Sequence, residues 1–142
     1  MNFIHIADLH CNKERKKYCL EALSIIKDFV KKTPSIILIA GDFWDSTITA
    51  TENSGFVDFV KSVKELCELT DVIIITGTPS HEPAGSCDIF ETFGAKVFKQ
   101  NIFTLINSRY GKFELIAMPE PRKQDFVCFS DINKAIQQNY ID

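Results

Sequence analysis

Three short apolar runs, separated by two stretches with helical periodicity, constrain the fold more than any other feature of this sequence. The runs are NFIHIA (2–7), SIILIA (35–40) and DVIIIT (71–76). The second and third are continuous, which is typical of parallel strands covered on both faces, whereas the first alternates. This order of strand, helix, strand, helix and strand predicts an α/β fold with a mainly parallel sheet.

The two intervening stretches carry apolar residues at the spacing of one helix face. From Lys13 to Lys32 we expect the buried face to consist of Cys19, Leu23, Ile26 and Val30, and Pro34 ends this helix. A second helix is predicted from about Glu52 to Leu69. Its inward-facing residues are expected to be Phe56, Phe59, Val60, Val63, Leu66 and Cys67. A short helical piece is predicted over 86–94.

The second half of the chain favours further strands. Strand-like segments lie at 96–100, 102–108 and 112–119, and the last two are joined across Arg109-Tyr110-Gly111. A terminal helix is predicted over 130–140. The sequence has no internal repeat and no linker, and a chain of 142 residues suits one domain. We therefore expect a single domain over 1–142.

Composition narrows the class of protein. The formal net charge of -3 gives no overall attraction to nucleic acid. No apolar run approaches the roughly 18 residues of a membrane span, and the N-terminus lacks the pattern of a signal peptide. The spacing of the five cysteines matches no zinc or redox motif. We therefore predict a cytoplasmic protein without a membrane partner and with free thiols, among which Cys11 is notable because it follows His10.

Polar residues of the kind that bind metals follow each of the three central runs. Asp8 and His10 follow the first, Asp42 follows the second, and the stretch 77–82 follows the third. Sites in parallel sheets lie beyond the carboxyl ends of the strands. Asp8 and His10 are two residues apart and can point the same way. A carboxylate with an imidazole suits manganese, iron or zinc, and Asp42 alongside them supplies a carboxylate that two metals can share.

Each of these residues has an ordinary structural interpretation as well. A single Asp at a strand end is most often a turn or cap residue. Asp45 fits a loop or cap role as well as a ligand-supporting role, His5 fits a structural role within its strand, and Trp44 fits packing. Three acidic residues are expected to be solvated or capping: Glu82, Asp88 and Glu120. The match of all three strand ends at once favours a site.

The motifs resemble those of a known family. Asp8-x-His10, then Gly41-Asp42-x-x-Asp45, then a Gly…His-acid cluster is the order found in calcineurin-like metallophosphoesterases. More narrowly, FIHIADLH, LIAGDFWDS, ITGTPSHEPAGSCDIFETFGAKVF and IAMPEPRK are similar to the SbcD-like nuclease subunit of SbcCD-type and Mre-type DNA repair exonucleases. The resemblance runs from residue 2 to about residue 124. It implies a layered α/β/β/α fold, of which this chain is the N-terminal part.

The resemblance also implies roles for individual residues. Asp8 and His10 are implied as ligands of one metal, and Asp42 as the bridge to a second. The implied cofactors are two divalent ions, Mn²⁺. His81 is implied as the catalytic residue that faces the scissile phosphate without binding metal. The family motif Gly-Asn-His is replaced by Gly77-Thr78-Pro79-Ser80-His81, in which Ser80 falls where the metal-binding Asn would be.

The chain departs from the family in a second way, because no histidine follows His81, whereas the family completes its site with later histidines. We expect this chain to be an N-terminal piece of a longer protein, with a naturally short chain or completion by another chain as alternatives. A one-metal or empty site is then expected. An exposed sheet edge would also favour a homodimer.

The function favoured by these motifs is metal-dependent phosphodiester hydrolysis, as a DNA exonuclease or endonuclease subunit in DNA repair. DNA and an SbcC-like ATPase subunit are the partners that the resemblance implies. Two alternatives stay open: a non-catalytic module with the same fold, and a phosphoesterase with a protein or nucleotide substrate. Basic residues near the motifs fit either phosphate contacts or a solvated face; they are Lys13, Arg15, Lys16, Lys17, Arg122 and Lys123.

Overall fold

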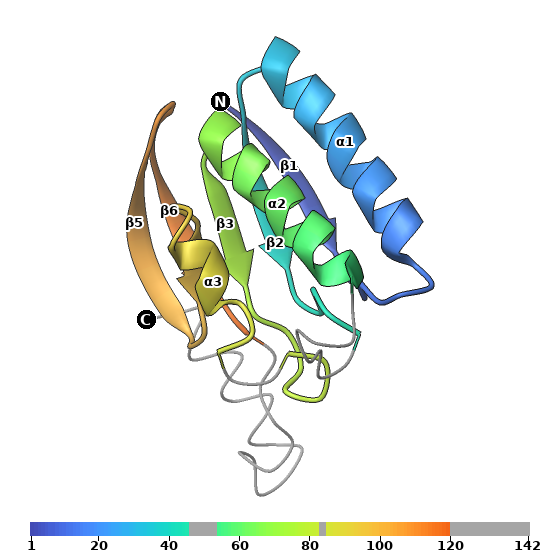
Figure 1. Cartoon of the computed structure of the whole chain (residues 1–142). Coiled ribbons are helices and arrows are strands. Elements are labelled where there is room, and N and C mark those ends of the chain that lie inside the picture. The colour runs from blue at the N-terminus through green and yellow to red at the C-terminus, as the bar shows by residue number, and fades with distance from the viewer. Residues whose placement is uncertain (46–53, 83–84, 120–142) are drawn as a thin grey trace, which may run out of the picture.

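A parallel sheet with helices on one face and a hairpin on the other forms the frame of the molecule (Figure 1). The computed structural model describes residues 1–45, 54–82 and 85–119. Its elements are β1 (Asn2–Ala7), α1 (Lys16–Lys32), β2 (Ser35–Ala40), α2 (Ser54–Leu69), β3 (Val72–Ile75), α3 (Asp88–Glu91), β4 (Lys96–Phe98), β5 (Ile102–Ser108) and β6 (Gly111–Ala117). The predicted order of strands and helices is confirmed, and the predicted helix over 130–140 lies outside the described residues.

The four strands of the main sheet are all parallel and lie in the order β1-β2-β3-β4. This confirms the predicted α/β class. In the register, Ala7 pairs with Ala40, and Ala40 pairs with Ile75. The first three strands therefore end at the same level, so the residues that follow them emerge together at one edge of the sheet.

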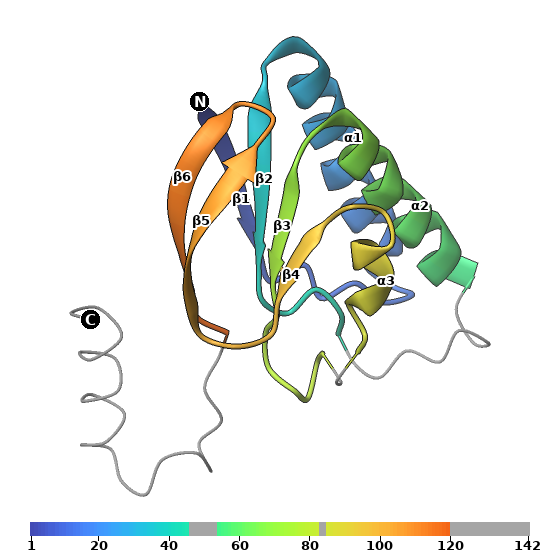
Figure 2. The same ribbon diagram turned by 90° about the vertical axis from the view of Figure 1, so that its left-hand side faces the viewer.

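Helices α1 and α2 cover one face of this sheet, as the two views show (Figures 1 and 2). The buried residues of α1 are those predicted from its periodicity: Cys19, Leu23, Ile26 and Val30. The predicted face of α2 is confirmed as well, with Phe59, Val63 and Leu66 fully buried. They join one core cluster with Ile37 and Ile39 of β2. Each such side chain contributes about 1.5–3 kcal/mol through burial.

The antiparallel hairpin of β5 and β6 lies over the opposite face (Figure 2). A second core cluster joins Ile36 of β2 and Ile73 of β3 to Ile106 of β5. The continuous apolar run of β2 is explained by this arrangement, because both of its faces are covered. In β1, Ile4 and Ile6 pack toward the helices, whereas His5 is exposed on the edge strand.

The hairpin is attached to the end of α2 through its turn. The guanidinium of Arg109 donates to the carbonyl oxygens of Cys67 and Glu68 at 2.8 and 3.0 Å, and its backbone N–H donates to Asp71 at 2.6 Å. The hairpin is thus fixed at the edge opposite the three strand ends.

Among the described helices, none has both the length and the apolarity that crossing a bilayer requires.

Candidate metal centre

The loops that follow β1 and β2 are joined to each other by backbone hydrogen bonds. Asp8 N–H donates to the Gly41 carbonyl at 3.3 Å, and His10 N–H donates to the Asp42 carbonyl at 2.9 Å. Cys11 N–H continues the series by donating to the Phe43 carbonyl at 3.0 Å. The parallel pairing therefore extends past the ends of the strands and places the first two motifs side by side.

Three residues of these loops adopt left-handed backbone conformations. Asp8, His10 and Asp42 have φ of 52°, 43° and 44°, and within the described ranges they are the only non-glycine residues with positive φ. This conformation costs most L-residues roughly 1–2 kcal/mol, although Asp and His adopt it more often than most. Such conformations cluster at functional sites. The three residues are the same ones that the motifs single out as metal ligands.

The side chains of these three residues converge. Their candidate ligand atoms all lie within 4.8 Å of one another, and His10 Nε2 is 3.9 Å from Asp42 Oδ2. Two carboxylates and an imidazole suit a divalent ion such as manganese, iron or zinc. The group fits one such ion. A cavity of about 270 Å³ adjoins it, lined in part by Asp8, Asp42, Gly77 and Met118. The ligand roles themselves stay predictions.

The loop after β3 contacts Asp42 through Thr78. The backbone N–H and the hydroxyl of Thr78 both donate to Asp42 Oδ1, each at 2.8 Å. Asp42 Oδ1 is therefore held by this loop, while Oδ2 faces His10. Gly77 permits this approach, since a Cβ there would lie 2.1 Å from the backbone nitrogen of Asp42. A residue with a side chain at this position would require one of the two loops to move.

Glu82 fastens the same loop to the loop after β2. Its side chain is only 6% exposed, and its carboxylate accepts the backbone N–H groups of Phe43 and Gly77. The expectation was a solvated or capping Glu82. The solvated role is wrong because the side chain is buried, whereas the bonds to these two backbone N–H groups are those of a capping residue. Burial raises the pKa of Glu82, and the two N–H donors oppose that shift.

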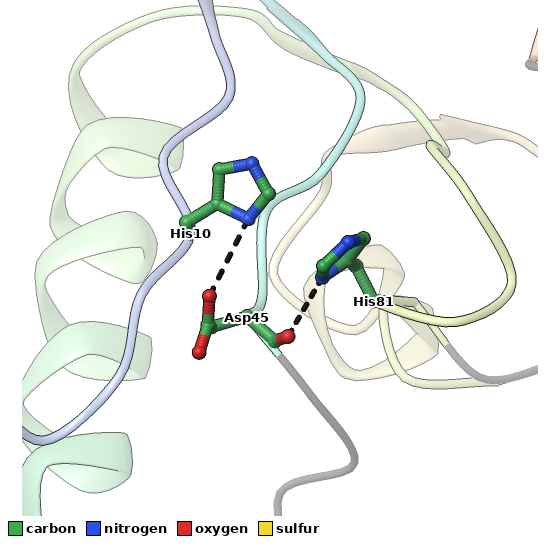
Figure 3. Close-up of side chains that lie close together, drawn as sticks. All are labelled: His10, Asp45 and His81. Carbon is green, nitrogen blue, oxygen red and sulfur yellow. Dashed lines mark hydrogen bonds and ion pairs between the residues drawn. The ribbon is translucent and has the colours of Figure 1, made fainter.

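His81 lies beside His10, with the two rings edge to face and their centroids 4.8 Å apart. Its Nδ1 is 2.7 Å from the main-chain oxygen of Asp45, and the Asp45 carboxylate is 3.6 Å from His10 Nδ1 (Figure 3). The structure thus brings the predicted catalytic histidine to the predicted ligands. It also places Asp45 beside both histidines. From the sequence, Asp45 fitted a loop or cap role as well as a ligand-supporting role.

Ser80 lies apart from this group of side chains. It is exposed, and its hydroxyl is 3.3 Å from the Thr78 hydroxyl. The ligand role of Ser80 stays a prediction. Thr78, for which the sequence predicts no role, is the residue that contacts Asp42. The available signal was position, since Thr78 directly follows Gly77, as the Asn of Gly-Asn-His follows its glycine.

The remaining candidates have structural roles or exposed positions. Trp44 is 2% exposed and stacks on Phe56 with centroids 5.2 Å apart, which confirms packing. Burial raises the pKa of the Cys11 thiol to about 12, so the thiol stays protonated in the metal-free protein. Asp88 is exposed and pairs with Lys99 at 2.6 Å, as expected for a solvated residue. Glu120, Arg122, Lys123 and Cys128 lie outside the described residues.

The cysteines among the described residues are free and buried: Cys11, Cys19, Cys67 and Cys87. This agrees with the prediction of free thiols for that part of the chain. Of the basic residues near the motifs, Lys13, Arg15 and Lys17 are exposed. Lys16 pairs with Asp58 at 2.7 Å and so links α1 to α2.

Comparison with known proteins agrees with this geometry. The model of one family, described as calcineurin-like phosphoesterase, matches residues 1–136. No curated protein matches the chain. The family match covers most of the sequence and includes both loops that carry Asp8, His10 and Asp42. This chain therefore belongs to the calcineurin-like phosphoesterase family.

Proposed function

We propose that this protein hydrolyses phosphodiesters with a divalent metal held by Asp8, His10 and Asp42. Membership of the family supports metal-dependent phosphoester hydrolysis in general. The observation that carries the proposal is the convergence of these three residues at the edge where the first three parallel strands end. Their candidate ligand atoms lie within 4.8 Å of one another, and their backbones are left-handed.

Each side chain then has its own task. When bound, a divalent metal supplies positive charge against the phosphate and makes water a better nucleophile. Asp8, His10 and Asp42 hold that charge beside the cavity, and Thr78 keeps the Asp42 carboxylate turned toward His10. Because Nδ1–H of His81 donates to the Asp45 carbonyl, His81 would protonate the leaving oxygen of the substrate from Nε2, as the imidazolium. His81 is thus the catalytic residue of the proposal.

The finer proposal is a manganese-dependent DNA exonuclease subunit that acts in DNA repair in the cytoplasm, with an SbcC-like ATPase as its partner. Its support is the similarity of FIHIADLH, LIAGDFWDS and the stretch after β3 to SbcD-like nucleases. In the same proposal, Asp42 and Ser80 would hold a second divalent metal. Among the described residues, the other group of possible metal ligands is His10, Asp45 and His81, which does not include Asp42.

The test combines metal binding and turnover. Titration calorimetry with Mn²⁺ is expected to show binding to the chain, and the Asp42→Asn variant is expected to lose it. Hydrolysis of a model phosphodiester and of linear DNA in Mn²⁺ is expected to fall by at least about a hundredfold in the same variant. Asp28→Asn is the matched control, since that aspartate is exposed on α1 and pairs with Lys31.

Three results would redirect the proposal. Undiminished turnover in Asp42→Asn would overturn the metal mechanism. Absence of Mn²⁺ binding by the intact chain would favour a non-catalytic module with the same fold. Turnover of a phosphoprotein or a cyclic nucleotide, without turnover of DNA, would replace the nuclease by a phosphoesterase of another substrate class.

A further inference from the structure

Asp45 contacts both histidines of the site through two different groups (Figure 3). Its carboxylate Oδ1 lies 3.6 Å from His10 Nδ1, and its main-chain oxygen accepts a hydrogen bond from His81 Nδ1 at 2.7 Å. One residue at the end of the second motif is therefore the common neighbour of the predicted ligand and the predicted catalytic histidine.

The carboxylate of Asp45 is itself held in place. Asn12 Nδ2 donates to Asp45 Oδ2 at 3.1 Å, which leaves Oδ1 toward His10. The Asn12 side-chain oxygen in turn accepts the backbone N–H of Arg15 at 2.8 Å, directly before α1. The backbone N–H of Asp45 donates to the Cys11 carbonyl at 3.4 Å. The position of Asp45 is thus fixed by the start of α1 and by the loop that carries His10.

The two nitrogens of His10 face different partners. Nε2 is 3.9 Å from Asp42 Oδ2, and Nδ1 is the nitrogen that faces Asp45. A neutral imidazole carries its proton on one nitrogen and offers a lone pair on the other. Histidines that bind metals usually give the second N–H to a carboxylate or a carbonyl, which fixes the tautomer and the ring orientation.

We infer that Asp45 is a positioning residue, whose carboxylate keeps the His10 proton on Nδ1 so that Nε2 is free to bind the metal shared with Asp8 and Asp42. The inference rests on the proposed function for the identity of that metal group. The main-chain oxygen of Asp45 has the same effect on His81 and keeps a proton on its Nδ1. Because this second contact is made by the backbone, it persists when the Asp45 side chain is changed.

The competing arrangement is a metal bound by Asp45 itself. His10, Asp45 and His81 also have candidate ligand atoms within 4.8 Å. The two arrangements exclude each other at His10, since Nδ1 cannot both donate a proton to Asp45 and bind an ion. The positioning role is favoured because the bond of His81 Nδ1 to the Asp45 carbonyl at 2.7 Å leaves only Nε2 of His81 as a ligand atom, and because Asn12 already occupies one oxygen of the Asp45 carboxylate.

The test measures Mn²⁺ affinity and histidine tautomers in variants of the whole chain. Calorimetry is expected to show Mn²⁺ binding weakened about 10–100-fold in Asp45→Ala. Asp45→Asn is expected to recover most of that loss, because its amide oxygen offers His10 Nδ1 an acceptor in place of the carboxylate oxygen. In the metal-free protein, ¹⁵N–¹H NMR is expected to show His10 protonated on Nδ1 and to lose that preference in Asp45→Ala, while His81 keeps its tautomer.

The outcomes separate this inference from the proposed function. If the unchanged protein binds no Mn²⁺, the proposed function fails, and the His10 tautomer still decides the role of Asp45. Unchanged affinity and an unchanged His10 tautomer in a folded Asp45→Ala variant would overturn the inference. Complete loss of Mn²⁺ binding in both Asp45→Ala and Asp45→Asn would overturn it as well, in favour of Asp45 as a ligand. If Asp45→Ala does not fold, the His10 tautomer is measured in Asp45→Asn instead, and loss of the proton from Nδ1 in that variant would overturn the inference.

Discussion

The loops after β1 and β2 and the loop after β3 meet at one edge of the sheet, but they are built in different ways. The first two are joined by backbone hydrogen bonds and place their candidate ligands in left-handed conformations. The third is attached by side chains, through Glu82 to the N–H of Phe43 and through Thr78 to Asp42. The first two loops therefore present Asp8, His10 and Asp42, and the third loop holds Asp42 in place.

The largest effect on this comparison is expected from Gly77→Ala. The added Cβ would meet the backbone nitrogen of Asp42 at 2.1 Å, so one of the two loops must move. We expect a loss of about 3 kcal/mol or more in the free energy of unfolding. Urea denaturation followed by circular dichroism measures it.

Gly94→Ala is the matched control for that measurement. Gly94 has a φ of +95°, and a Cβ there meets nothing within 4 Å. Its substitution therefore costs about 1 kcal/mol through the backbone alone. Equal losses at the two positions would show that the close approach of Gly77 to Asp42 carries no special weight.

Glu82→Gln is expected to have the next largest effect. The amide offers one acceptor oxygen where the carboxylate offers two, and it turns an N–H₂ group toward a backbone N–H of Phe43 or Gly77. A buried N–H group without a partner costs about 1–3 kcal/mol. Glu91→Gln serves as the control, since Glu91 is exposed and pairs with Lys99 at 3.7 Å. A loss no larger than that of the control would contradict the fastening role of Glu82.

Asp8→Asn is expected to act in the opposite direction. The carboxylates of Asp8 and Asp42 have oxygens within 4.8 Å, and without a metal they repel each other. Removing one charge, at a left-handed position that Asn also tolerates, is expected to stabilise the metal-free protein by up to about 1 kcal/mol. The same change is expected to abolish Mn²⁺ binding. Glu21→Gln, an exposed change on α1, controls for net charge, and destabilisation by Asp8→Asn alone would contradict the expectation.

The sequence was sufficient to predict the elements whose apolar residues recur periodically, and the residues that follow parallel strands ending at the same level. Strand β2 was identifiable because it is apolar on both faces, and α1 because Cys19, Leu23, Ile26 and Val30 repeat at helical spacing. Asp8 and Asp42 follow directly from the parallel sheet, since strands that end level bring the next residues together.

The contacts of the third loop were beyond the reach of sequence patterns. A carboxylate in a polar stretch of sequence is usually solvated. The sequence therefore did not indicate that Glu82 is buried against two backbone N–H groups. The choice between Thr78 and Ser80 depends on how the two inserted residues fold. The conformation of this loop depends on the packing of Gly77 against Asp42, which cannot be predicted from the spacing of residues in the sequence.

The smallest effects on the free energy of unfolding are expected from the pair Thr78→Val and Ser80→Ala. This pair tests most directly which residue of the third loop supports the ligands of the first two loops. Valine keeps the shape of Thr78 but loses the hydroxyl bond to Asp42, so we expect a loss of about 1 kcal/mol in urea denaturation. Ser80 is exposed, so its change is expected to stay within about 0.5 kcal/mol.

Mn²⁺ titration then separates the roles of the two hydroxyls. If Ser80 binds a second ion, Ser80→Ala lowers the number of ions bound per chain and Thr78→Val does not. If Thr78 only orients Asp42, Thr78→Val weakens Mn²⁺ binding at unchanged stoichiometry, because Asp42 Oδ2 is less firmly directed at His10. A drop in stoichiometry for Thr78→Val alone would transfer the predicted ligand role from Ser80 to Thr78, the residue that already touches Asp42.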